Sequence, residues 1–261
     1  MTDTNTDFVL NVAGVSKRFG GLQALSDVGI QIRRGQVYGL IGPNGAGKTT
    51  FFNVLTGLYA PDSGTFELAG KPYKPTAVHL VAKAGIARTF QNIRLFADMT
   101  ALENVMVGRH VRTGSGVIGA IFRGPGFRAE EAAIAKRAQE LLEYVGIGKF
   151  ADYKARTLSY GDQRRLEIAR ALATDPQLIA LDEPAAGMNA TEKVLLRELI
   201  DRIRKDDRTI LLIEHDVKLV MGLCDRVTVL DYGKQIAEGT PATVQKNEKV
   251  IEAYLGTGGG H

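Results

Sequence analysis

One glycine-rich segment constrains the fold of this chain more than any other feature. Residues 42–49 read GPNGAGKT and match the pattern G-x-x-x-x-G-K-[ST]. The compact apolar run VYGLI precedes the segment, and apolar residues at helical spacing follow it. Glycines let the backbone curl so that successive N–H groups point at phosphate oxygens. We therefore predict a phosphate-binding loop between a buried strand and a helix, with Lys48 reaching the β- and γ-phosphates and the Thr49 hydroxyl ligating Mg²⁺.

Two later apolar runs end in polar side chains that suit phosphate chemistry. The run LIALDE ends in Asp182 and Glu183, and the run TILLIEH ends in His215. Ligands of open α/β sheets bind at the carboxyl ends of the strands. We therefore expect Asp182 to serve the Mg²⁺ ion, Glu183 to polarise the attacking water, and His215 to contact the γ-phosphate.

The stretch LSYGDQRRLEIARAL, residues 158–172, predicts a second anion site. It starts as a polar turn and continues as an amphipathic helix, with Ser159 and Gly161 where the helix begins. A helix N-terminus offers free backbone N–H groups and the positive end of the helix dipole to an anion. The chain would thus carry two separate half-sites for phosphate.

The order of elements predicts the fold class. Strand patterns alternate with helix patterns, which indicates an α/β fold with a mostly parallel sheet and helices on both faces. In the middle region a helix pattern carries one apolar stripe, made of Ile134, Ala138, Leu141, Leu142 and Val145. Asn189 with Glu192 three residues later predicts a helix N-cap, and Thr240 followed by Pro241 predicts the start of a final helix.

The Gly-rich segment over residues 112–127 has two interpretations. It contains the apolar patch VIGAIF. The patch either folds back into the domain as part of a loop or contacts a partner protein. The pattern leaves both open.

The composition excludes several classes of protein. The 261 residues include one cysteine, Cys224, so no internal disulfide is expected, which fits a reducing compartment. The net charge of +4 has no basic block of the kind that binds nucleic acid. Residues 1–7 lack the apolar core of a signal peptide, and no apolar run approaches the roughly 18 residues of a membrane span. We expect a cytoplasmic protein.

Together, Lys48, Asp182, Glu183, His215 and residues 158–165 resemble the ATP-binding subunit of ABC transporters. The resemblance covers nearly the whole chain. It implies an α/β fold: a P-loop NTPase core with a mostly parallel sheet, an N-terminal antiparallel β region and a helical subdomain. The implied domain spans residues 8–255, with a RecA-like core over 8–91 and 158–240, a helical subdomain over about 92–157, a C-terminal helix over about 241–255, and a disordered tail over 256–261.

The resemblance also implies a site for ATP and Mg²⁺. Phe19 would stack on adenine, and Gln91 would touch Mg²⁺ and the attacking water, alongside the catalytic Glu183 and His215. Thr49, Gln91 and Asp182 would hold the metal. The loop residues implied to bind ATP are Gly42, Pro43, Asn44, Gly45, Ala46, Gly47, Lys48, Thr49 and Thr50.

The second half-site resembles the family's L-S-G-G-Q signature. Ser159, Tyr160, Gly161 and Asp162 occupy its positions, with Tyr160 in place of the first Gly and Asp162 in place of the Gln. The phosphate-facing Ser159 and Gly161 are kept. Asn189 stands where the family's D-loop usually has Asp, so no charged contact across the subunits is expected there.

The family implies partners. Two ATPase subunits pack head to tail, and each ATP is held by the loop of one subunit and the signature of the other. The second ATPase could be another copy or a different chain. Two integral membrane permeases and, indirectly, a periplasmic substrate-binding protein complete the system at the cytoplasmic face of the inner membrane, and no nucleic acid is involved.

Longer segments resemble a particular branch of the family. GIARTFQNIRLFADMTALENVMVGRH and LLIEHDVKLVMGLCDRVTVLDYGKQIAEGTP are similar to the longer ATPase of branched-chain amino-acid importers. The ATPases of urea or amide importers and of lipopolysaccharide exporters are the alternative. Two rival classes fit less well. An ABC ATPase of ribosomes or DNA usually has two such domains or a long coiled coil, and a mere nucleotide sensor would not need Glu183.

Overall fold

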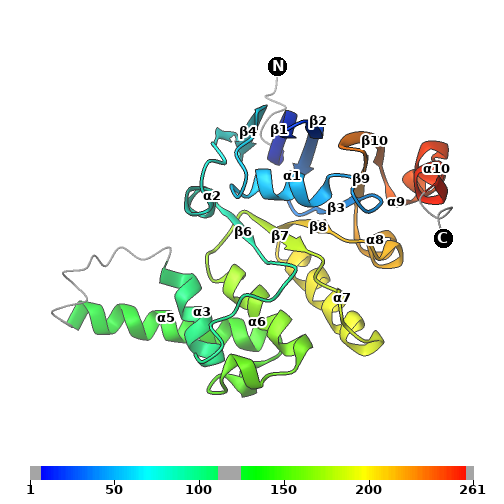
Figure 1. Cartoon of the computed structure of the whole chain (residues 1–261). Helices are drawn as coiled ribbons and strands as arrows, with labels where there is room; N and C mark the ends of the chain where they lie inside the picture. Colours follow the sequence, from blue (N-terminus) through cyan, green and yellow to red (C-terminus); the bar gives the residue numbers. More distant parts are fainter. Residues whose placement is uncertain (1–6, 111–124, 257–261) are drawn as a thin grey trace.

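The computed structural model describes residues 7–110 and 125–256 (Figure 1). The chain begins with an antiparallel sheet in the order β2-β1-β4-β5. This sheet contains β1 (Phe8–Phe19), β2 (Leu22–Arg33), β4 (Ser63–Leu68) and β5 (Lys71–Pro72). It forms the antiparallel β region that the resemblance implied.

The second sheet has the order β10-β9-β3-β8-β7-β6. Its strands are β3 (Val37–Ile41), β6 (Ile86–Arg88), β7 (Leu178–Asp182), β8 (Thr209–Ile213), β9 (Arg226–Asp231) and β10 (Lys234–Gly239). The pairs from β9 to β6 are parallel, and β10 is antiparallel to β9. The mostly parallel sheet is confirmed.

The central strands are apolar throughout because both faces of the sheet are covered. Every residue of β3, β7 and β8 is buried. Along β7, Leu178 and Ala180 belong to one core cluster, and Ile179 and Leu181 belong to the other. Successive side chains of a strand point to opposite faces, so a doubly covered strand reads as a continuous apolar run.

One face of the sheet packs against α1 (Lys48–Leu55), α2 (Val78–Ala84) and the antiparallel sheet. The other face packs against α6 (Tyr160–Leu172), α7 (Ala190–Lys205) and α8 (Val217–Leu223) (Figure 1). The N-cap predicted at Asn189 is present: its side chain accepts the Glu192 N–H, and the Glu192 carboxylate accepts the Asn189 N–H. Two layers of helix and strand thus enclose the sheet that carries the site.

The middle of the chain forms a helical region beside the sheet. It contains α3 (Ala101–His110), α5 (Pro125–Tyr144) and two short 3₁₀ turns, Gly148–Phe150 and Ala155–Thr157. The five residues of the predicted apolar stripe are all buried. Helix α6 packs on α3 and α5 and also contacts β6, so it joins this region to the sheet.

The C-terminal region differs from the single helix expected over residues 241–255. Thr240 caps α9 (Pro241–Gln245) as predicted, but the chain then breaks and starts again as α10 (Glu248–Gly256). The break lies at Asn247, whose side chain accepts the Lys249 N–H and so begins a new helix. Gly256, placed in the predicted tail, ends α10, and residues 257–261 lie outside the described part.

The Gly-rich segment and its apolar patch lie largely outside the described residues. Of the Gly-rich segment over 112–127, only residues 125–127 are described, and they begin α5. Within residues 7–110 and 125–256, no helix has the length and apolar character needed to cross a membrane.

Candidate nucleotide-binding site

The glycine-rich loop connects the end of β3 to the start of α1. Its backbone takes positive φ at Gly42, Gly45 and Gly47, with φ of 97° at Gly47, the N-cap of α1. A Cβ at Gly42 would collide with the Leu230 carbonyl oxygen, and one at Gly47 would lie 2.9 Å from that of Ala24. The loop can curl this tightly only with glycine at both places. Its N–H groups and the N-terminus of α1 suit a phosphate group.

The Lys48 side chain is buried against the loop itself. Its Nζ donates to the carbonyl oxygens of Gly42 at 2.6 Å and Pro43 at 2.8 Å. Burial lowers the pKa of Lys48, and the negative charge of Glu183 opposes that change. The structure therefore holds the Lys48 side chain beside the glycine-rich loop.

A cavity of about 360 Å³ lies over the loop. Its lining includes Phe19, Asn44 to Thr50 of the loop, Glu183 and Tyr232. Phe19 is 42% exposed and meets Tyr59 edge to face, with ring centroids 5.2 Å apart. An exposed aromatic ring at the rim of a phosphate-binding cavity can stack on a base.

The carboxyl end of the sheet brings the predicted catalytic residues together. In the register of β7 and β8, Asp182 lies opposite Ile213, so the residues that follow each strand meet. The Gln91 side chain donates to Glu183 Oε2 at 2.9 Å, and His215 Nδ1 lies 3.5 Å from the same oxygen. Glu183, Gln91 and His215 thus form one cluster at the edge of the cavity.

Glu214, which the sequence patterns did not single out, forms hydrogen bonds to the backbone next to this cluster. It is fully buried, and burial raises the pKa of its carboxyl group. Its Oε1 accepts the Ala185 N–H at 2.9 Å and its Oε2 accepts the His215 N–H at 3.2 Å. Glu214 therefore ties the chain after Glu183 to the chain at His215. The sequence signal that could have identified Glu214 was its position between an apolar strand and His215.

Asp182 is buried at the end of β7 and paired with an arginine. Its Oδ2 lies 3.2 Å from Arg88 Nη2, across the neighbouring strand β6. Burial raises the pKa of Asp182, and the Arg88 charge opposes the rise. Arg88 was not predicted from the sequence, although it stands three residues before Gln91.

The signature residues lie apart from the cavity. Ser159 caps α6, where its Oγ accepts the Asp162 N–H and donates to Asp162 Oδ2 at 2.7 Å. Asp162 also pairs with Arg165 at 2.6 Å. Among the described residues that line the cavity, none comes from 159–162. The structure therefore keeps the two predicted half-sites separate within one chain.

A buried ion pair missed from the sequence links the signature helix to Gln91. Arg164 and Glu167 are at most 1% exposed and lie 2.8 Å apart. Arg164 donates to the carbonyl oxygens of Phe90 and Gln91, and Glu167 accepts the Phe90 N–H. Their spacing of three on one helix was visible in the sequence, but only the structure shows that the helix turns this side toward residues 90–91.

The fold and the cavity define a class of protein. A glycine-rich loop at a helix N-terminus, a lysine on that loop, and carboxylates at the ends of neighbouring parallel strands are the parts of a P-loop nucleotide triphosphatase. The comparison with known proteins specifies the family. The family model described as ABC transporter matches residues 25–186, and the model described as Branched-chain amino acid ATP-binding cassette transporter matches residues 234–259.

Similar proteins agree over almost the full length. The chain is 46% identical to the high-affinity branched-chain amino acid transport ATP-binding protein BraF of Pseudomonas aeruginosa, over 95% of this chain and 98% of that protein. It is 45% identical, with the same coverage, to LivG of Escherichia coli K12, which has the same description. The crystal structure of the ADP conformation of MJ1267, an ATP-binding cassette of an ABC transporter, matches with a TM-score of 0.83 and 32% identity, over 95% of this chain and 99% of that one.

The chain therefore belongs to the ATP-binding subunits of ABC transporters, which hydrolyse ATP to power transport. Such subunits are peripheral to the membrane, work with membrane permeases and form dimers. The predicted family, fold class and ATPase activity are confirmed.

Proposed function

We propose that this chain is the ATPase subunit that powers import of branched-chain amino acids. The observation that carries the proposal is the 46% identity to a branched-chain amino acid transport ATPase over 95% of the chain. The separate match of residues 234–259 to a model of such transporters supports the same substrate class. Import of urea or amides and export of lipopolysaccharide are the alternatives that the experiment below separates.

We propose that Mg²⁺ binds with the ATP, held by the Thr49 hydroxyl, the Asp182 carboxylate and the Gln91 amide oxygen. These are oxygen donors, which Mg²⁺ prefers, and Mg²⁺ usually combines one or two protein ligands with substrate phosphates. When bound, the ion would neutralise charge on the β- and γ-phosphates.

The other roles follow from position. Phe19 stacks on adenine, and residues 42–50 hold the phosphates. Glu183 accepts a proton from the attacking water, which Gln91 orients, and His215 contacts the γ-phosphate. The contacts that support this assignment are those of Gln91 and His215 with one Glu183 oxygen.

We further propose that a second ATPase subunit completes the site. Ser159, Tyr160, Gly161 and Asp162 of one chain would face the γ-phosphate held by the loop of the other. The separation of residues 159–162 from the cavity of their own chain supports this arrangement. Hydrolysis would remove the charge that joins the pair. The second subunit is another copy of this chain or a different ATPase.

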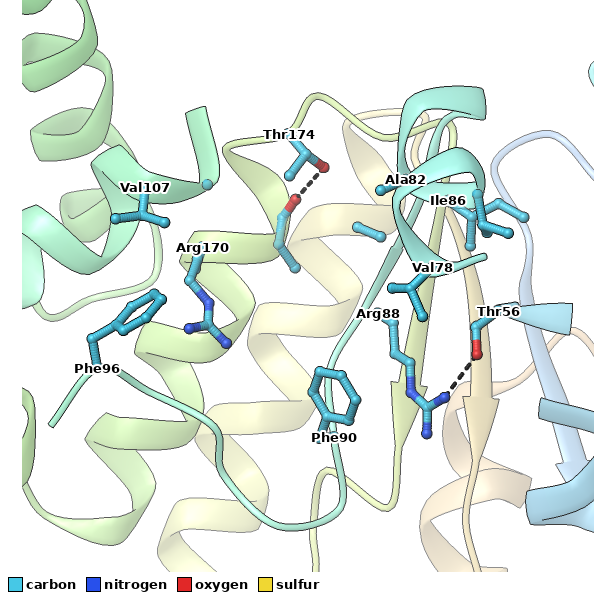
Figure 2. Close-up of a pocket in the computed structure, with 14 residues that line it drawn as sticks. Thr56, Val78, Ala82, Ile86, Arg88, Phe90, Phe96, Val107, Arg170 and Thr174 are labelled. Atoms are coloured by element: carbon cyan, nitrogen blue, oxygen red, sulfur yellow. Dashed lines mark hydrogen bonds between the residues drawn. The ribbon is translucent and has the colours of Figure 1, made fainter. Parts of the chain in front are cut away.

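The permeases would contact this chain at a groove between α2, β6, α3 and α6. The groove has a volume of about 280 Å³, and its lining is largely apolar (Figure 2). It lies close in sequence to Gln91, because Arg88 and Phe90 are part of its wall. This contact would hold the chain at the cytoplasmic face of the inner membrane, beneath two permeases that receive substrate from a periplasmic binding protein.

Uptake by cells tests the substrate class. The gene is deleted in its own host, and uptake of radiolabelled leucine, isoleucine, valine and urea is measured. We expect loss of amino-acid uptake, restoration by the intact gene, and no restoration by a Glu183→Gln variant. Normal amino-acid uptake in the deletion strain, with loss of urea uptake or of lipopolysaccharide at the cell surface, would instead support an alternative.

A further inference from the structure

Arg88 joins the groove to the end of β7, where Asp182 lies. The residue is the last of β6, an edge strand of the parallel sheet, and its partner in the register with β7 is Ala180. Its side chain is 10% exposed and is part of the groove wall (Figure 2). Arg88 therefore belongs to two places that the proposed function treats as separate: the surface for the permeases and the Mg²⁺ site.

The guanidinium of Arg88 is held on several sides. Its Nη1 donates to Thr56 Oγ1 at 2.7 Å, and its Nη2 donates to Asp182 Oδ2 at 3.2 Å. The rings of Phe52 and Phe90 lie 4.5 and 4.8 Å from its central carbon. The two hydrogen bonds run to Thr56, the C-cap of α1, and to Asp182 of β7, so the planar guanidinium connects the end of α1 with the Asp182 carboxylate.

The Asp182 carboxylate depends on this fork for its orientation. Both partners are buried, with side chains 10% and 5% exposed, so neither is pulled toward water. A carboxylate that binds a metal is usually oriented by a hydrogen-bonded neighbour, and loss of that neighbour lowers metal affinity or activity by about 10- to 100-fold. Arg88 bonds one carboxylate oxygen, Oδ2, and this fixes the direction of the other.

On the side that faces the groove, the packing around Arg88 can rearrange. Its Nε is buried and, among the described residues, has no hydrogen-bond partner. Phe90, which covers the guanidinium, and Val78 of α2, which is 43% exposed, line the same groove (Figure 2). A side chain that fills the groove would press on the Phe90–Arg88 stack, because packed side chains transmit displacement to their neighbours.

We infer that Arg88 is a positioning residue: it orients the Asp182 carboxylate toward Mg²⁺ and transmits occupancy of the groove to that carboxylate. The inference rests on the proposed Mg²⁺ site and groove. It adds a specific physical connection between them that does not pass through the Gln91 side chain.

Nucleotide binding with and without the metal tests the positioning role. The purified chain is titrated with a fluorescent, non-hydrolysable ATP analogue in Mg²⁺ and in EDTA, and the ratio of the two affinities is the readout. For Arg88→Met we expect this ratio to fall by about 10-fold, with the affinity in EDTA within about twofold of wild type. Arg88→Lys keeps the charge but not the fork, so a fall of about threefold is expected.

Arg94→Met is the matched control. The Arg94 guanidinium packs on the same Phe90 ring, 4.5 Å from its centre, but Arg94 is exposed, and within the described residues its side chain does not bond to Asp182. We expect the ratio of analogue affinities in Mg²⁺ and EDTA to equal that of wild type in this variant. Thermal melting checks that each variant is folded. If Arg88→Met does not fold, Arg88→Lys decides the question, and a wild-type ratio in a folded Arg88→Lys would overturn the positioning role.

A double-mutant cycle tests transmission from the groove. Val78→Trp adds bulk to the groove. In a chain that keeps Arg88, we expect this change to alter the ratio of analogue affinities in Mg²⁺ and EDTA by about threefold. In a chain that carries Arg88→Lys, we expect Val78→Trp to leave the ratio unchanged. An equal change in both chains, or none in either, would overturn transmission through Arg88.

The controls separate this inference from the function on which it rests. If Mg²⁺ does not strengthen binding of the analogue to the wild-type chain, the proposed metal site itself fails. If Mg²⁺ strengthens binding equally in wild type and Arg88→Met, the metal site stands and only the role of Arg88 fails.

Discussion

At the scale of the residue, Glu183 shows how the backbone aims a side chain. Its φ is 44°, in the left-handed region that residues other than glycine rarely adopt. Such a conformation costs about 1–3 kcal/mol and persists only where surrounding contacts hold it. Here the Glu183 N–H donates to the Ile213 carbonyl oxygen at 2.9 Å, and the Ala186 N–H donates to the Glu183 carbonyl oxygen. These bonds turn the carboxylate toward Gln91 and His215.

The first prediction concerns this carboxylate. Glu183→Gln should slow ATP turnover by about 10²–10⁴-fold, because a positioned general base contributes that much. Nucleotide affinity should stay within a few-fold of wild type, since the amide keeps the shape of the side chain. Phosphate release and analogue binding measure the two effects. Glu198→Gln, an exposed change on α7, is the control with normal turnover. Equal turnover in both variants would contradict a base at Glu183.

A second prediction separates binding from chemistry at Lys48. Lys48→Ala should weaken nucleotide binding about 10- to 100-fold, because hydrogen bonds to charged groups contribute about 1.5–3 kcal/mol. Lys205→Ala, at the exposed end of α7, removes a lysine elsewhere and should bind normally. Equilibrium titration with a fluorescent ATP analogue checks both. Wild-type affinity in Lys48→Ala would show that the phosphate-binding loop is elsewhere.

At the scale of the element, α6 is joined to the site by the buried pair of Arg164 and Glu167. The pair fastens α6 to the backbone of residues 90–94 through four hydrogen bonds: Arg164 donates to the carbonyl oxygens of Phe90 and Gln91, and Glu167 accepts the N–H groups of Phe90 and Arg94. Movement of α6 would therefore move the residue that contacts Glu183. Breaking a buried pair leaves one charge uncompensated, which costs about 3–5 kcal/mol.

A third prediction follows for stability. Arg164→Met should lower the free energy of unfolding by about 3–5 kcal/mol near pH 8. Burial already raises the pKa of Glu167 and Arg164 opposes the rise, so loss of Arg164 raises this pKa further. A carboxyl group with a raised pKa in the folded state favours folding as the pH falls.

Denaturant unfolding of Arg164→Met at several pH values provides the measurement. The loss relative to wild type should shrink as the pH falls through the raised pKa of Glu167, because protonation removes the unpaired charge. The double variant Arg164→Met with Glu167→Gln lacks that charge and should show a loss that depends less on pH. A constant loss in the single variant would mean that Glu167 is not the group responsible.

At the scale of the whole molecule, the two half-sites belong to different regions. The phosphate-binding loop lies where the parallel sheet meets the antiparallel sheet, whereas Ser159 caps a helix that packs on α3 and α5 (Figure 1). One chain cannot bring its phosphate-binding loop and its Ser159 to the same nucleotide without a large rearrangement. In the arrangement that we propose, a second subunit would supply the missing half-site, and ATP would then shift the population from separate to paired subunits.

The fourth prediction is pairing that depends on ATP. The Glu183→Gln chain should form dimers in Mg²⁺ and ATP, because hydrolysis no longer removes the γ-phosphate that joins the subunits. Light scattering during size-exclusion chromatography measures the mass. Addition of Ser159→Arg to this chain should abolish pairing without loss of ATP binding, since it removes the hydroxyl that would face the γ-phosphate and places a bulky side chain where the partner subunit would pack. A monomer at saturating ATP would contradict pairing between copies of this chain.

The parts of the site that could be predicted from the sequence are local. The glycine pattern of residues 42–49, the apolar strands that end at Asp182 and before His215, the helix start at Ser159 and the caps at Asn189 and Thr240 all act over a few neighbouring residues. The boundary at Asn247 was missed, because a helix pattern on both sides hid one capping side chain. Arg88, Arg164, Glu167 and Glu214 were missed for another reason: each is defined by its partners, and most of those partners are distant in the chain.

By itself, the sequence determined the class of fold, the phosphate-binding loop and the identity of the residues at the strand ends, because backbone conformation and burial pattern are set by nearby residues. The tertiary structure decided which side chains share a site. Gln91 meets Glu183 across 92 positions of the chain, and Arg88 meets Asp182 across 94. Such pairings follow from the order of strands β6, β7 and β8 in the sheet, and long-range packing sets that order.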